Sequence, residues 1–214
     1  MFLFGHIGIT MAAIYLLAVA LSSLKKNSGH YGLLVKELDF RLVVITAMLP
    51  DIIDKIVGMV ILKEEIANGR IYSHTILGFT IISICLFIAV KLRTDKTVKT
   101  ALYILPLWIH LVLDRMWENL HTLFWPSRGF SFPKLDIEFS DYFPMLVSEP
   151  YIFLGEILGI VVILFLFIKH RLLNPKRFVS FIRSGILATE AEDYKVRIHN
   201  SDSDSCGKNR GSVR

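Results

Sequence analysis

Aspartates and a histidine recur inside the apolar stretches of this sequence, at spacings that suit a helix. The segment MLPDIIDK, residues 48–55, carries Asp51 and Asp54, and the segment WIHLVLD carries His110 and Asp114. Residues three or four apart are neighbours on one face of a helix, so each pair is expected to project in one direction. Two helices would then present an Asp/Asp pair and a His/Asp pair.

Two further histidines, His6 in FGHIGIT and His74 in GRIYSHT, begin other apolar segments. An ionised aspartate at the centre of a lipid-embedded helix costs roughly 2.5 to 3.5 kcal/mol on insertion scales, and something must offset that cost. Imidazoles and carboxylates without thiolates are the ligands of hydrolytic zinc, manganese or iron sites. Coordination of a divalent cation would neutralise the aspartates and offset their desolvation. We therefore expect one or two divalent metal ions, with zinc first and manganese or iron as alternatives.

The alternative for each residue alone is structural. A single histidine in an apolar helix is more often hydrogen-bonded to a neighbour than bound to metal, and a lone PDxxD or HxxxD is a weak motif. The joint placement of six candidate ligands on four segments is what favours a metal site.

The segments that carry these residues are predicted to be membrane spans. The chain has 214 residues, of which 53% are hydrophobic, and a mean hydropathy of +0.53, whereas a soluble domain is nearer 45 to 50% apolar. Because a span needs about 20 apolar residues, the sequence predicts an all-α, multi-pass transmembrane helical bundle of about five spans. The second and fourth apolar runs could instead be buried core helices. The runs are 8–24, 42–62, 75–92, 100–113 and 151–168.

Basic residues alternate between the loops and predict the orientation. Four lie in 25–41 and four in 91–99, against two in 63–73, three in the longer 114–150, and ten after residue 168. By the positive-inside rule, the amino terminus is outside and the carboxyl terminus is cytoplasmic. Asp51 and His110 would then lie about halfway across the membrane.

The same count predicts two parts: a membrane-embedded domain over 1–175 and a basic, disordered cytoplasmic tail over 176–214. Up to residue 168 the chain has 14 basic and 14 acidic residues, so the net charge of +5 belongs to the residues after 168. We therefore expect the lipid bilayer as a partner and no nucleic acid. His6 and His74 fall further out than Asp51, and a tilt or a re-entrant turn would be needed to bring them level.

In order and spacing, the motifs over residues 5–133 resemble the membrane-bound metal-dependent hydrolases of bacteria and archaea, which include the LexA-regulated inner-membrane hydrolases. The resemblance rests on the early His6, on LPDIID, on GRIYSHT, and on HLVLDRMW followed by LFWPSRGFSFP. It implies a multi-pass protein of the prokaryotic inner membrane. One departure is Gly69, where many members have a histidine. The metal ligands that the resemblance implies are His6, Asp51, Asp54, His74, His110 and Asp114.

Three further residues are candidates for catalysis. Arg70 could bind a phosphate or carboxylate of the substrate, or it could be an ordinary arginine at an interface. Glu118 and His121 could serve as general acid or base, or could simply be solvated polar residues at a helix end. The aromatic segment 122–150 is interpreted as a flap over the site, or as a plain loop with anchoring aromatic residues.

The leading hypothesis is a membrane-bound metal-dependent hydrolase that cleaves an ester or phosphoester, with a lipid-like substrate. The alternative is a small ion- or proton-coupled membrane transporter that uses midplane Asp and His residues, and a third is a non-catalytic scaffold that displays the basic tail. A transporter should carry comparable polar residues in the inner half of the membrane. The sequence indicates none there.

Overall fold

The fold, obtained as a computed structural model, consists of helices joined by turns. The structure describes residues 3–24, 33–94, 96–134 and 142–187, and these ranges contain no strand, which confirms the prediction of an all-α protein. The elements are α1 (Leu3–Leu24), α2 (Leu33–Glu37), α3 (Phe40–Asp54), η2 (Lys55–Ile61), η3 (Tyr72–His74), α4 (Ile76–Lys91), α5 (Thr97–Leu113), η4 (Met116–Glu118), α6 (Leu120–Leu123), α7 (Tyr142–Ser148), α8 (Pro150–Lys169) and α9 (Pro175–Ser184).

Each of the five predicted apolar runs coincides with a helix of the bundle. They fall on α1, on α3 with η2, and on α4, α5 and α8. By length and hydropathy, α1 and α8 are candidate membrane spans, whereas α4 and α5 are shorter apolar helices.

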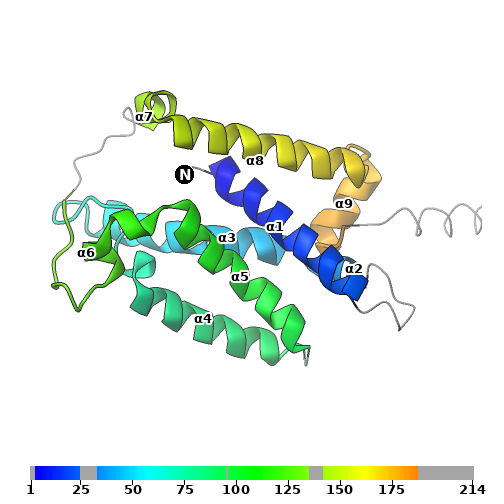
Figure 1. Cartoon of the computed structure of the whole chain (residues 1–214), viewed down its shortest axis with the longest axis horizontal. Coiled ribbons are helices and arrows are strands. Elements are labelled where there is room, and N and C mark those ends of the chain that lie inside the picture. The colour runs from blue at the N-terminus through cyan, green and yellow to red at the C-terminus, as the bar shows by residue number, and fades with distance from the viewer. Residues whose placement is uncertain (1–2, 25–32, 95, 135–141, 188–214) are drawn as a thin grey trace, which may run out of the picture.

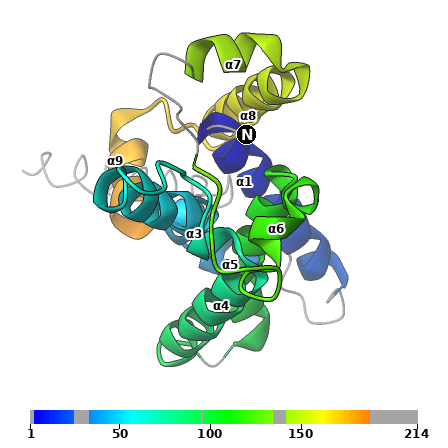
Figure 2. The same cartoon turned by 90° about the vertical axis from the view of Figure 1, so that its left-hand side faces the viewer.

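The long helices are arranged in an order that places α1 near the middle. Helix α1 packs against α8, α3 and α5, and α4 packs against α5. In Figure 1, α1, α4 and α8 run in one direction and α3 and α5 in the other. Figure 2 looks along the bundle and shows α8 on one side of it and α4 on the opposite side.

Two glycines allow α1 and α8 to approach closely. A Cβ atom on Gly8 would lie 2.2 Å from the carbonyl oxygen of Gly159, and one on Gly159 would lie 2.0 Å from that of Phe4. At the same crossing, the buried carboxylate of Glu156 accepts hydrogen bonds from the backbone N–H groups of Phe4 and Gly5, both at 2.9 Å. A carboxylate is stabilised at a helix N-terminus, where the first N–H groups lack partners within the helix.

The largest apolar core lies at one end of the bundle, the end at which α2 and α9 meet the other helices in Figure 1. Its fully buried side chains include Ile14, Leu38, Phe40, Val43 and Leu187. The predicted site residues lie on the opposite halves of α1, α3 and α5. The hydrophobic effect therefore holds one end together, and the other end needs polar interactions.

A hairpin follows α3. The helix begins at its N-cap Asp39 and continues into the π-helical turns of η2, after which the chain turns back toward η3. Gly58 makes the return possible, because a Cβ atom there would lie 1.9 Å from the carbonyl oxygen of Asn68. The hairpin supplies the re-entrant turn that the sequence required for His74.

The first part of the predicted tail differs from expectation. Residues Pro175–Ser184 form α9, which is fastened to the start of α3: Phe40 N–H donates to Gly185 O at 2.8 Å, and Arg41 Nη1 donates to Ile182 O at 2.8 Å. These backbone and guanidinium bonds hold α9 against the start of α3. Residues 188–214 of the predicted tail lie outside the described residues.

Candidate metal centre

Four ligand groups converge where α3, η3 and α5 meet. His74 Nε2 lies 3.2 Å from His110 Nε2, 3.4 Å from Asp51 Oδ1 and 3.4 Å from Asp114 Oδ2. His110 Nε2 lies 3.6 Å from Asp51 Oδ1 and 3.9 Å from Asp114 Oδ2. All four residues are buried, and all four ligand atoms lie within 4.8 Å of one another.

These separations match those around a metal ion. Zinc ligands at about 2.0 to 2.2 Å from the ion lie roughly 3.3 to 3.6 Å from one another in a tetrahedron. The Asp51/His74/His110/Asp114 group could therefore hold a metal ion.

The hydrogen bond at Nδ1 of each histidine leaves Nε2 as the ring nitrogen that faces the centre. His110 Nδ1 lies 2.7 Å from the carbonyl oxygen of Ala47, which can only accept, so this nitrogen carries a proton. His74 Nδ1 lies 2.8 Å from Asp54 Oδ2 and donates in the same way. In the neutral rings, both Nε2 atoms are then acceptors aimed at two carboxylate oxygens. A proton on one ring would satisfy one such contact, whereas a divalent cation would satisfy all four groups.

Asp54 lies behind the group instead of in it. Its fully buried carboxylate accepts hydrogen bonds from the backbone N–H groups of Ile71 at 2.6 Å, Ser73 at 2.9 Å and His74 at 3.2 Å, besides that from His74 Nδ1. Ser73 Oγ also donates to Pro50 O at 2.7 Å. These bonds fasten the η3 turn to the end of α3, and they fix the ring of His74 as outer carboxylates do for metal-binding histidines.

His6 reaches the centre from α1, also from outside the convergent group. Its Nε2 lies 2.9 Å from Asp114 Oδ1, and its ring stacks on His110, with centroids 4.1 Å apart and planes 17° apart. Among the predicted metal ligands, the structure thus brings four into one group and places Asp54 and His6 in contact with members of it.

Two cations bind the carboxylates of Asp51 and Asp114. Lys55 Nζ lies 2.8 Å from Asp51 Oδ2, and Arg70 Nε lies 2.8 Å from Asp114 Oδ2. Arg70 was predicted as a candidate for binding substrate, whereas Lys55 was not among the predicted site residues. The i, i+4 spacing of Asp51 and Lys55 could have indicated the pair. Glu156 was missed as well, although a lone carboxylate in an apolar run was a signal.

The structure places the predicted acid or base residues on the surface. Glu118, on η4, pairs with Arg115, and both side chains are exposed. His121 is exposed on α6, and neither Glu118 nor His121 is among the four convergent residues. Their catalytic role stays a prediction.

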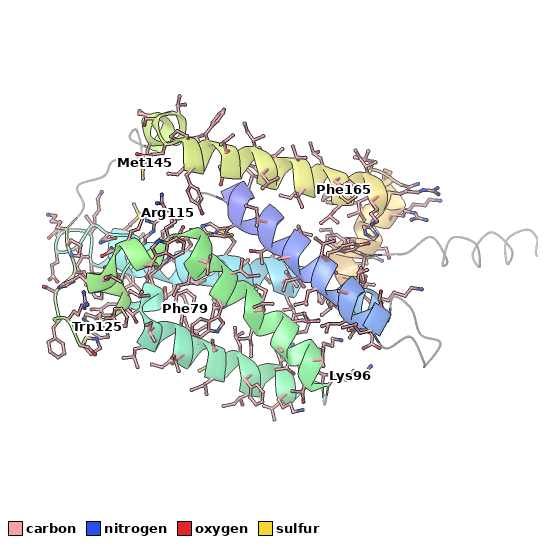
Figure 3. The ribbon with its side chains drawn as sticks, in the orientation of Figure 1. Phe79, Lys96, Arg115, Trp125, Met145 and Phe165 are labelled. Carbon is pink, nitrogen blue, oxygen red and sulfur yellow. The ribbon has the colours of Figure 1, made fainter. Side chains whose placement is uncertain are left out.

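An aromatic cluster covers the turn that carries His74. The Tyr72 ring lies edge-on to Trp125 and Phe132, at centroid distances of 5.2 and 4.9 Å, and Trp125 stacks on Phe132 at 5.7 Å. Asn68 Nδ2 donates to Pro133 O at 2.9 Å. Figure 3 shows Trp125 and Arg115 at the end of the molecule opposite Lys96. The predicted flap up to residue 134 thus packs on the hairpin beside the centre. Residues 135–141 lie outside the described residues, and the rest of the segment forms α7 (Tyr142–Ser148) and the start of α8.

Gly69, the departure from the resembling family, lies beside Lys55. A Cβ atom at this position would lie 3.4 Å from Lys55 Cγ and 3.3 Å from Met59 Sδ. A larger side chain would press on the lysine that pairs with Asp51.

A comparison with known protein families agrees with the membrane interpretation. No curated protein and no solved structure matches the chain. Residues 1–176 match the family described as the YdjM inner membrane protein family, so the predicted location in the inner membrane is confirmed. The match covers every described helix except the greater part of α9. With its inner-membrane helices and its buried His/Asp group, the chain belongs to the YdjM inner membrane protein family.

Proposed function

We propose that this protein is an inner-membrane metal-dependent hydrolase with one divalent ion, zinc first, held by Asp51, His74, His110 and Asp114. The observation that carries the proposal is the convergence of two histidine Nε2 atoms and two carboxylate oxygens in a buried site. Four acceptors without a cation among them would repel one another at low dielectric. Asp54 and His6 would hold His74 and Asp114 in position.

A divalent ion that binds water beside these four ligands would lower the pKa of that water to near 7 and supply a nucleophile at neutral pH. The chain's own residues would do the rest. Asp54 keeps the proton of His74 on Nδ1, so that Nε2 remains a ligand. The aromatic cluster of Tyr72, Trp125 and Phe132 would limit access to the site from one side.

The proposed substrate is a lipid-like ester or phosphoester that reaches the site from the outer half of the membrane. The alternating directions of α1, α3, α4, α5 and α8 support five spans, and the distribution of basic residues favours an outside amino terminus. Under that orientation, the metal centre lies toward the outer face and the α2 and α9 end toward the cytoplasm.

Elemental analysis of the detergent-purified protein tests the metal. We expect about one divalent ion per chain in the wild type, and none in Asp51→Asn or His110→Ala. The matched control is Glu65→Gln, which removes an exposed carboxylate on the hairpin and should keep the ion.

Equal metal content in the wild type and in both centre variants would overturn the assignment. Thermal unfolding of each variant separates loss of ligands from loss of the fold, because a folded variant still unfolds in one cooperative transition.

A further inference from the structure

Lys55 and Arg70 are two partly exposed cations at the rim of the metal centre. Gly69, which precedes Arg70, lies against Lys55, because a Cβ atom on Gly69 would lie 3.4 Å from Lys55 Cγ. Each cation binds one carboxylate of the centre with one nitrogen, at 2.8 Å. The Lys55 side chain is 46% exposed and that of Arg70 is 40% exposed, whereas the carboxylates that they contact are buried. Their remaining donors are therefore accessible at the edge of a closed site.

Both side chains still have hydrogen-bonding capacity. A guanidinium has five N–H donors and an ammonium has three. Within the part of the chain that the structure describes, the Arg70 side chain contacts Asp114 through Nε, and the Lys55 ammonium contacts Asp51. The two terminal nitrogens of Arg70 present the planar fork that binds phosphate in a bidentate way.

The charges at the centre favour an anion. Three buried carboxylates, those of Asp51, Asp54 and Asp114, face two cations, Lys55 and Arg70. A divalent ion in the site leaves one positive charge in excess, with the histidines neutral. An uncompensated charge in a buried site is costly, so a ligand with one negative charge is favoured over a neutral carboxylic ester.

We propose that the substrate is a phosphoester, whose anionic phosphate is bound between Lys55 and Arg70. This inference rests on the proposed hydrolase and narrows its substrate class. In the reaction, the water oxygen bonds to phosphorus and the bond from phosphorus to the leaving alcohol oxygen breaks. One proton of the water ends on the alcohol and the other is released from the product phosphate.

The probe is inorganic phosphate, whose binding to the zinc-loaded, detergent-purified protein is measured by titration calorimetry. We expect Lys55→Met and Arg70→Gln each to weaken phosphate binding about tenfold or more, the effect of losing one charge-assisted hydrogen bond. Lys55→Arg keeps the charge and should retain most of the affinity. The matched controls are Lys63→Met and Arg128→Gln, exposed cations away from the centre, which should bind phosphate as the wild type does.

Metal content is measured on the same samples. A wild type without bound metal overturns the proposed function. A metal-loaded wild type, with Arg70→Gln and Lys55→Met binding phosphate as tightly as the controls, overturns this inference alone. If Lys55→Met loses its metal, the phosphate affinity of Arg70→Gln tests the inference by itself. Arg70 lies on the hairpin and contacts the centre only from its rim.

Competition distinguishes the sources of the phosphate group. Displacement of phosphate by phosphatidic acid in mixed micelles assigns a lipid headgroup, and displacement by glycerol phosphate alone assigns a soluble phosphoester; both results support the proposal. Failure of every phosphoester to compete, while a neutral ester such as a triacylglycerol does so, contradicts it.

Discussion

At the scale of single residues, identical side chains have different tasks because their neighbours differ. Asp51 directs one oxygen at the two histidines and the other at Lys55. Asp54, one helical turn later, accepts hydrogen bonds from three backbone N–H groups and from His74 Nδ1. Asp51 can therefore be a metal ligand, whereas the carboxylate of Asp54 is already hydrogen-bonded to the η3 turn.

Substituting Asn for Asp54 tests this division. An amide has one oxygen in place of two and brings its own N–H donors toward the backbone donors of the η3 turn. We expect Asp54→Asn to lower the free energy of unfolding by about 2 to 3 kcal/mol and to weaken metal binding about 10- to 100-fold. Thermal unfolding and a metal titration measure the two effects, with Glu64→Gln as the exposed control. Metal affinity equal to that of the wild type would contradict the positioning role.

At the scale of elements, short segments adjust how long helices meet. The hairpin after α3 returns the chain so that His74 lies level with Asp51, which the spacing along straight helices does not allow. On the other side of α1, Gly8 and Gly159 let α8 approach, and Glu156 binds the first N–H groups of α1. Since α1 carries His6, this crossing also sets where that ring lies.

The glycine crossing predicts a steric effect. Gly8→Ala places a Cβ atom 2.2 Å from a backbone oxygen of α8, and backbone cannot rotate away as a side chain can. Separation of the two helices should lower the thermal midpoint by several degrees, which corresponds to about 1 to 3 kcal/mol of overpacking. Ala20→Val, at an exposed position of α1, is the control. An unchanged midpoint for Gly8→Ala would show that the helices are not in such close contact.

The N-cap of α3 predicts a pH effect on stability. Burial raises the pKa of the Asp39 carboxyl, but hydrogen bonds from the side chain and backbone of Arg41 outweigh it, so the pKa lies below its usual range. Because the folded pKa is the lower one, Asp39 stabilises the fold above its unfolded pKa, about 3.9, and this contribution is lost as the pH falls through the folded value.

The wild type should therefore unfold at a higher temperature than Asp39→Asn at pH 7, and the difference should shrink below about pH 4. Thermal unfolding of both proteins between pH 7 and pH 3 measures it. A difference that stays constant across this range would mean that the carboxylate charge contributes nothing. Asp39 acts at the junction of α3 with Gly185. Gly185 has a φ of +71°, which suits glycine, and a Cβ atom there would lie 1.6 Å from Asp39 Oδ1.

At the scale of the whole molecule, the two ends of the bundle differ in chemistry. The largest cluster of buried apolar side chains lies where α2 and α9 pack, and the buried carboxylates of Asp51, Asp54 and Asp114 lie at the end that carries α6 and the hairpin. Because charged groups are costly in hydrocarbon, this polarity favours one orientation, with the centre toward water at one face of the membrane.

Cysteine labelling tests that orientation. In a background of Cys85→Ser and Cys206→Ser, Glu64→Cys on the hairpin should react with a membrane-impermeant maleimide in intact cells. Arg93→Cys, between α4 and α5, should react only after the membrane is opened. The reverse pattern would place the metal centre toward the cytoplasm, and labelling of both sites in intact cells would contradict the predicted spans between them.

The positions of the helices and the identities of the candidate ligands could be predicted from the sequence alone. Period and hydropathy are local properties, so the five apolar runs coincide with α1, α3 with η2, α4, α5 and α8. The pairing of Asp51 with Asp54 and of His110 with Asp114 follows from helical spacing, and the structure places all four residues at the predicted junction.

Which of these groups can bind the metal and which support a ligand depends on the tertiary structure. Whether Asp54 faces the centre or the backbone of η3 depends on a hairpin whose path is fixed by Gly58 and Asn68, far from any helical rule. The contacts of Glu156 with α1 and of Arg70 with Asp114 join residues distant in sequence. Such contacts depend on how the packed helices are placed in space, and local periodicity carries no information about that placement.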